Sequence, residues 1–186
     1  MKRVEIKIPC GEIMKNIATW SYTIGELVPD EQAKQRHFIQ GATDFGHVSL
    51  IKDALDMAWV DMLDALSAYM VNGCDCGCDA ESCDCGNDDG SMTEYELQGE
   101  PFELHDYCAT LYFPDDTYPN LGYKISTTVK QYILMKCRAQ WETILGRDPS
   151  MSEAAAEKAR ARLKVTITTR IPIGHTQSEW SNFIKF

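Results

Sequence analysis

The sequence predicts an α+β fold: mainly a helical bundle, made of a helical hairpin and one long helix, with a small β-sheet. Apolar residues recur every three or four positions over 123–170 and again over 47–70, as on one side of an α-helix. Segments near the N-terminus and within 93–113 alternate apolar and polar residues instead, the period of a half-buried strand. With 186 residues and 44% apolar content the chain suffices for one core, so we expect a single domain over 1–186.

The N-terminal segment is the first predicted strand. Apolar side chains occupy alternate positions of 4–8, and Pro9 ends the run. A helix is expected over 12–27, where apolar residues return at helical spacing. A shorter helix is expected from Asp30, as its N-cap, through residue 40.

The next expected element is a helix of about six turns over 47–70. Four aspartates fall beside or opposite its apolar stripe: Asp53, Asp56, Asp61 and Asp64. We interpret them as a solvated outer face rather than a metal or catalytic cluster, since surface helices place charge opposite the core.

Cysteines dominate the segment that follows. Five of the eight are crowded into a Gly- and Asp-rich stretch: Cys74, Cys76, Cys78, Cys83 and Cys85. We expect an inserted loop at about 72–92. Three interpretations of these cysteines stand side by side: they bind a soft metal such as zinc, they form disulfides outside a reducing cell, or they hold no ligand. The CxCxC and CxC spacing is tighter than that of common zinc sites.

Alternating residues return over 93–97 and 103–113, which predicts strands that pair with each other or with the N-terminal strand. The chain ends in an extended arm at about 171–186. Its large apolar side chains are too many for a free tail, so we expect them to bind the body or a partner: Trp180, Phe183, Ile184 and Phe186.

The helical hairpin lies between these strands and the arm. Its first helix carries the stripe Ile125, Val129, Ile133, Cys137, Trp141 and Ile144. Gly146 is expected to end that helix, and Pro149 cannot continue it. Ser150 stands three residues before Glu153, the spacing of a capping box. An Ala-rich second helix can then approach the first closely.

Charge is divided unevenly along the chain. Residues 1–52 carry seven basic and six acidic side chains, 53–123 carry none and seventeen, and 124–186 carry eleven and five. Opposite poles can meet a complementary partner, including another copy of the chain. Alternatively, folding intermixes the regions and neutralises them internally. The net charge of −10 argues against a general nucleic-acid binder.

No catalytic motif is evident. The four histidines form no HxxxH pair, and the sequence contains no GxGxxG, GxxxxGK[ST] or GxSxG. No apolar run approaches the roughly 18 residues that span a bilayer, and the N-terminus lacks the apolar core of a signal peptide. We therefore expect a protein that is not an enzyme, works inside a cell or in a particle assembled there, and has no membrane partner.

Two segments of the hairpin resemble virion proteins. The strings 127–135 and 138–142 are similar to the helix of head–tail connector (adaptor) proteins of tailed bacteriophages, in which a turn and a second helix follow. Residues 152–163 resemble proteins encoded among virion genes of phages and prophages of gut Bacteroidetes, including crAss-like phages. The resemblance covers about a quarter of the chain.

The resemblance implies a subunit of a ring, expected to be a dodecamer, at the neck of a virion assembled in the host cytoplasm. Portal protein and tail or neck proteins would be its partners, and DNA would pass through the ring without sequence-specific binding. Two other hypotheses stand beside it. One is a metal-binding regulatory or interaction module centred on Cys74–Cys85; the other is an acidic DNA-mimic inhibitor that uses the acidic residues of 53–116.

Overall fold

The computed structural model describes residues 1–41, 45–70, 93–97, 100–104 and 106–169. It is a helix-dominated α+β structure, as the sequence predicts. Its helices and strands, in chain order, are β1 (Lys2–Ile8), α1 (Cys10–Glu26), the 3-10 turn η1 (Asp30–Gln32), α2 (Ala33–Gln40), α3 (Phe45–Leu66), the 3-10 turn η3 (Ser67–Tyr69), β2 (Thr93–Leu97), β3 (Glu100–Leu104), β4 (Tyr107–Phe113), α4 (Leu121–Ile144) and α5 (Ser150–Thr168).

The strands pair as two antiparallel ladders. β1 pairs with β4, in a register that sets Lys2 opposite Phe113 and Ile8 opposite Tyr107. β2 pairs with β3. Side chains of β1 alternate between buried and exposed, so one face of the β1–β4 ladder packs on the core and the other faces solvent. The predicted pairing with the N-terminal strand is confirmed.

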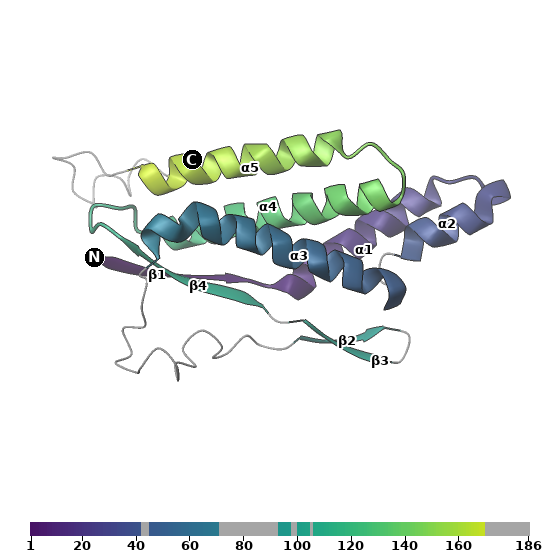
Figure 1. Ribbon diagram of the computed structural model, residues 1–186, viewed down its shortest axis with the longest axis horizontal. Helices are drawn as coiled ribbons and strands as arrows, with labels where there is room; N and C mark the ends of the chain where they lie inside the picture. Colours follow the sequence, from purple (N-terminus) through teal and green to yellow (C-terminus); the bar gives the residue numbers. More distant parts are fainter. Residues whose placement is uncertain (42–44, 71–92, 98–99, 105, 170–186) are drawn as a thin grey trace, which may run out of the picture.

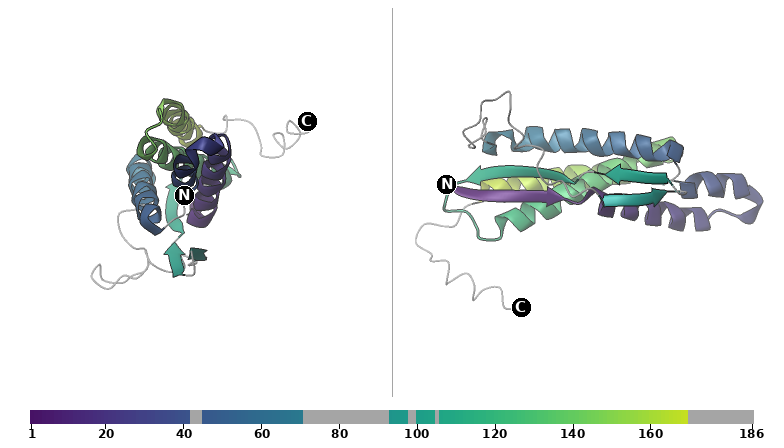
Figure 2. Two further views of the ribbon diagram at one scale, coloured as in Figure 1. Left: turned by 90° about the vertical axis from the view of Figure 1, so that its right-hand side faces the viewer. Right: turned by 90° about the horizontal axis from the view of Figure 1, so that it is seen from below.

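Helix α4 is the centre of the molecule. It packs against α5 along its length and also contacts α3, α1 and β1. Figure 1 shows α4 running between α5 and the β1–β4 ladder, and Figure 2 shows the helices gathered on one side of the strands. The predicted α4 stripe is buried from Ile125 to Trp141, and Ile144 is half-buried. One hydrophobic cluster joins β1, β4, α1, α3, α4 and α5.

The turn between α4 and α5 is set by its backbone. Gly146 has a φ of 67°, the left-handed conformation in which glycine avoids a steric cost. Its N–H donates to the Thr143 carbonyl at 3.0 Å, and the next N–H, of Arg147, donates to the Glu142 carbonyl at 2.8 Å. These two bonds form a Schellman motif, so the predicted helix stop at Gly146 is confirmed.

The two predicted N-caps are wrong. Helix α5 begins at Ser150 as expected, but Ser150 donates its hydroxyl to Asp148 at 2.9 Å and makes no capping box with Glu153. At η1 the Asp30 side chain makes no cap bond and instead pairs with Arg36 at 2.7 Å. At η1 the Arg36 guanidinium is a stronger donor to the Asp30 carboxylate than the backbone N–H groups that a cap would use. At α5 the N–H and the hydroxyl of Ser150 both donate to Asp148, so neither takes part in a capping box.

Candidate interaction surfaces

The site residues predicted from the sequence lie outside the described residues. This holds for the five clustered cysteines, Cys74, Cys76, Cys78, Cys83 and Cys85, and for the arm residues Trp180, Phe183, Ile184 and Phe186. Within the described part of the chain, no group of three or more His, Cys, Asp or Glu side chains could hold a metal ion. None of the described helices is long and apolar enough to cross a membrane.

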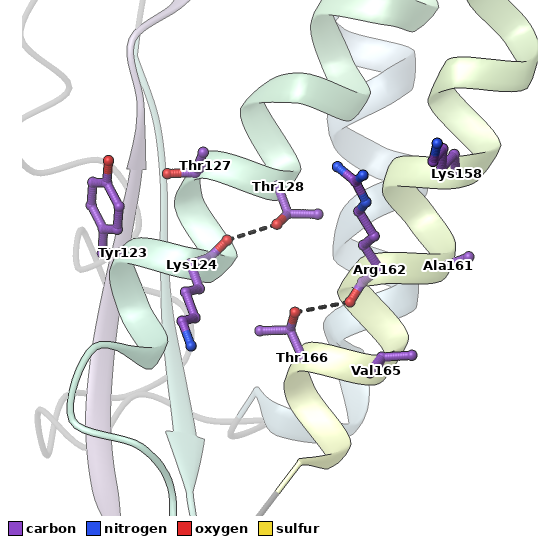
Figure 3. Close-up of a pocket in the computed structure, with 9 residues that line it drawn as sticks. All are labelled: Tyr123, Lys124, Thr127, Thr128, Lys158, Ala161, Arg162, Val165 and Thr166. Atoms are coloured by element: carbon purple, nitrogen blue, oxygen red, sulfur yellow. Dashed lines mark hydrogen bonds between the residues drawn. The ribbon is translucent and has the colours of Figure 1, made fainter. Parts of the chain in front are cut away.

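A basic groove of about 550 Å³ lies between the first half of α4 and the second half of α5. Its lining combines three cations with hydroxyl and apolar side chains and includes no carboxylate. The lining residues are Tyr123, Lys124, Thr127, Thr128, Lys158, Ala161, Arg162, Val165 and Thr166 (Figure 3). We call this surface the basic groove.

Among the described residues, the cations of the basic groove have no acidic partner. Lys124, Lys158 and Arg162 are exposed, and none of them forms an ion pair with any residue in the described ranges. The Lys124 ammonium lies 5.5 Å from the centre of the Tyr118 ring, a cation–π contact that leaves its charge uncompensated. Positive charge therefore accumulates in this groove.

Large apolar side chains are exposed beside these cations. The Tyr123 side chain is 77% exposed and that of Val165 is 66% exposed. The threonines add hydroxyls that are partly engaged: Thr128 donates to the Lys124 carbonyl at 2.8 Å, and Thr166 donates to the Arg162 carbonyl at 2.9 Å (Figure 3). Arginine and aromatic side chains such as Arg162 and Tyr123 are enriched in protein interfaces relative to the rest of the surface.

A second groove, of about 300 Å³, lies between α3, the second half of α4 and the start of α5. Three carboxylates and one lysine line it, so its net charge is −2. The lining residues are Leu50, Asp53, Ala54, Met57, Ala58, Asp61, Lys136, Ala139, Gln140, Thr143 and Glu153. We call this surface the acidic groove.

Charge and apolar area again lie side by side at the acidic groove. The hydroxyl of the buried Tyr132 donates to Asp61, one of the lining residues, at 3.2 Å. Burial, and then the neighbouring Asp61 charge, raise the pKa of Tyr132 to about 12, so this hydroxyl stays a donor. The Met57 side chain is 72% exposed and that of Leu50 is 42% exposed.

The two grooves open on opposite sides of the α4–α5 hairpin. Lys124 in the basic groove and Gln140 in the acidic groove are both on α4, sixteen positions apart. At 100° per residue these side chains project about 160° apart around the helix axis. One copy of the chain can therefore present both grooves at the same time, to different neighbours.

The opposite charges of the chain meet in part within the described residues. No ion pair among these residues joins a carboxylate of 53–123 to a cation of the hairpin, but Lys7 pairs with Asp106 at 3.4 Å and the Met1 ammonium pairs with Asp115 at 3.2 Å. The hairpin lysine Lys136 also lies among the carboxylates of the acidic groove. The fold therefore intermixes the acidic region with its neighbours at these points and leaves the cations of the basic groove apart from it.

The sequence shows the uneven distribution of charge between 53–123 and 124–186, but it does not predict the two grooves. The four aspartates of α3 are exposed, as predicted, although Asp56 and Asp61 also accept hydrogen bonds from tyrosines. A signal for the basic groove exists in the sequence: Lys158 and Arg162 are four positions apart and fall on one face of α5. Their proximity to α4 depends on how the hairpin packs, which spacing along one helix cannot specify.

Comparison with known proteins found no matching family model, no similar curated protein and no similar solved structure.

Proposed function

We propose that this chain is a structural virion protein of a tailed bacteriophage. In this proposal it forms an oligomeric ring at the head–tail junction, joins portal to tail and surrounds the DNA channel. The observation that supports it best is the pair of oppositely charged grooves on opposite sides of the α4–α5 hairpin. The resemblance of 127–142 and 152–163 to connector proteins supplies the biological setting.

A ring subunit needs two different contact surfaces, because each copy must bind one neighbour on each side. The hairpin provides the framework for them, and its helices are joined by the Schellman turn and packed through the buried α4 stripe. The aspartates of α3 that lie outside the acidic groove, Asp56 and Asp64, also suit a wall past which DNA moves, because they repel the phosphate backbone. The proposed role is architectural: the two grooves supply contact surfaces for neighbouring copies.

Cross-linking mass spectrometry on purified virions of the phage or prophage that encodes the chain would test this function. We expect the chain in the particles, in many copies, with cross-links from hairpin lysines such as Lys124 and Lys158 to portal, tail or neighbouring copies. A capsid protein from the same sample serves as the reference for copy number. Particles that contain the other virion proteins but lack this chain would contradict the proposal.

A further inference from the structure

We infer that the acidic groove of one copy binds the basic groove of a second copy of the same chain. This inference names the partner of these surfaces within the proposed ring, and to that extent it rests on the proposed function. The argument for the contact itself uses only the charge, apolar exposure and placement of the two grooves.

Charge is the first argument. The acidic groove offers the carboxylates Asp53, Asp61 and Glu153, and the basic groove offers three cations with no carboxylate among them. Complementary potentials of this kind steer association and fix which surfaces meet. The attraction between carboxylates of one copy and cations of the other would be stronger where the contact excludes water, because bulk solvent screens charges on an exposed surface.

The exposed apolar side chains are the second argument. Leu50 and Met57 stand in the acidic groove, and Tyr123 and Val165 in the basic groove, each at least 42% exposed. Contact between the grooves would cover all four, and the Met57 thioether is suited to packing against the edge of an aromatic ring. A phosphate backbone in the basic groove would satisfy the cations but leave the acidic groove and its apolar residues without a partner.

The placement of the grooves is the third argument. Because they open on opposite sides of the hairpin and differ in charge, the contact uses unlike surfaces on its two partners. Such a head-to-tail contact leaves one groove free at each end of a pair, so further copies can add. The series closes into a ring when the rotation per copy permits it.

Two charge-reversal variants test the contact. The acid-reversed variant, Asp53→Lys/Glu153→Lys, changes the net charge of the acidic groove from −2 to +2. The base-reversed variant, Lys158→Glu/Arg162→Glu, changes that of the basic groove from +3 to −1. All four side chains are exposed, so both variants should fold.

Sedimentation velocity over a range of concentration and salt is the measurement. We expect the unaltered chain to self-associate, with an affinity that falls as salt rises. Each variant alone should associate at least about tenfold more weakly, because like charges then meet across the contact. An equal mixture of the two variants should regain association, since each groove of one then finds an opposite charge on the other.

Two further measurements make the result specific. The control variant Lys15→Glu/Lys34→Glu removes as much positive charge from exposed positions of α1 and α2 outside both grooves, and it should associate like the unaltered chain. A zero-length amine–carboxyl cross-linker, applied to a mixture of isotopically light and heavy chains, should join Lys158 of one copy to Asp53 or Glu153 of another.

The inference is overturned if the two variants stay monomeric when mixed while the unaltered chain associates, or if the unaltered chain shows no association at any concentration. Salt-sensitive binding of short duplex DNA that requires Lys158 and Arg162, without self-association, would also overturn it. Self-association of a chain that is absent from virions would uphold the contact and reject the neck function. A chain that is present in virions but does not self-associate would reject the contact and leave the neck function in place.

Discussion

Trp141 on α4 donates a hydrogen bond from its indole Nε1 to the Ser21 hydroxyl of α1, at 3.0 Å. Both side chains are fully buried. The Ser21 hydroxyl in turn donates to the carbonyl of Ile39 on α2. One small side chain therefore links three helices, and it allows a tryptophan to lie in the core with its only polar group satisfied.

Replacement of Ser21 by Ala should destabilise the fold. The buried indole N–H would lose its acceptor and the Ile39 carbonyl its donor, and an unsatisfied buried group costs about 1–3 kcal/mol. Urea unfolding followed by tryptophan fluorescence measures this loss. Thr23→Ala is the matched control, because Thr23 lies on the same helix but is exposed and bonds only to the Thr19 carbonyl. Equal losses in the two variants would mean that the Trp141–Ser21 bond contributes no stability.

The hydrogen bonds of Ser21 could not be predicted from the sequence. Periodicity identified α1 and the α4 stripe with Trp141, because the core selects apolar residues every three or four positions. A serine within α1 carries no such signal. Its value depends on how α1, α2 and α4 cross, which is tertiary information.

At the turn of the hairpin, the sequence predicts the end of α4 but not the hydrogen bonds at the start of α5. Gly146 was predicted to end α4, because a left-handed residue has few chemical alternatives to glycine. The start of α5 was located correctly, but its hydrogen bonds were not. Asp148 accepts the Ser150 N–H that the Glu153 carboxylate would accept in a capping box, and spacing alone does not choose between these two acceptors.

Gly146→Ala should cost about 1 kcal/mol, since an L-residue with a Cβ is strained in the left-handed region. Gly146 has a φ of 67°, which lies in this region, and no atom lies within 4 Å of the position that a Cβ would occupy. The loss is therefore one of backbone strain and not of packing. Thermal or urea unfolding measures it. Gly146→Asn is the control and should lose less, because Asn tolerates this region better. An unchanged stability in Gly146→Ala would show that the turn adopts another conformation.

Asp148→Ala should destabilise the chain at neutral pH but not in acid. Hydrogen bonds from the Ser150 N–H and hydroxyl hold the pKa of the Asp148 carboxyl below its ordinary 3.8. A lowered folded-state pKa gives stability that is present above the unfolded-state pKa and lost as pH falls through the folded one. The difference between the variant and the unaltered chain should be constant above pH 5 and shrink once pH falls below about 4.

Unfolding in urea at a series of pH values measures that difference. Ser150→Ala is the companion variant: it removes the hydroxyl donor and keeps the backbone N–H, so its effect should be smaller and follow the same pH trend. A difference that persists unchanged at pH 2.5 would contradict the carboxylate's role at this turn.

Three cysteines in the described regions should differ sharply in reactivity. Burial raises the pKa of the Cys10 thiol to about 12 and also raises that of Cys137, which lies on α4 in the same core cluster, whereas Cys108 is exposed. The thiolate is the nucleophile, so the raised pKa keeps Cys10 in the unreactive thiol form at pH 8, and burial blocks the access of a reagent. Iodoacetamide should therefore modify Cys108 in the folded chain and spare the other two.

Peptide mass spectrometry reads each site separately, and the same reaction in concentrated urea, where all three should be labelled, is the control. Labelling of Cys10 and Cys137 at the rate of Cys108 in the folded chain would mean that the packing of α1 against α4 opens readily, and with it the support for the hairpin and its two grooves.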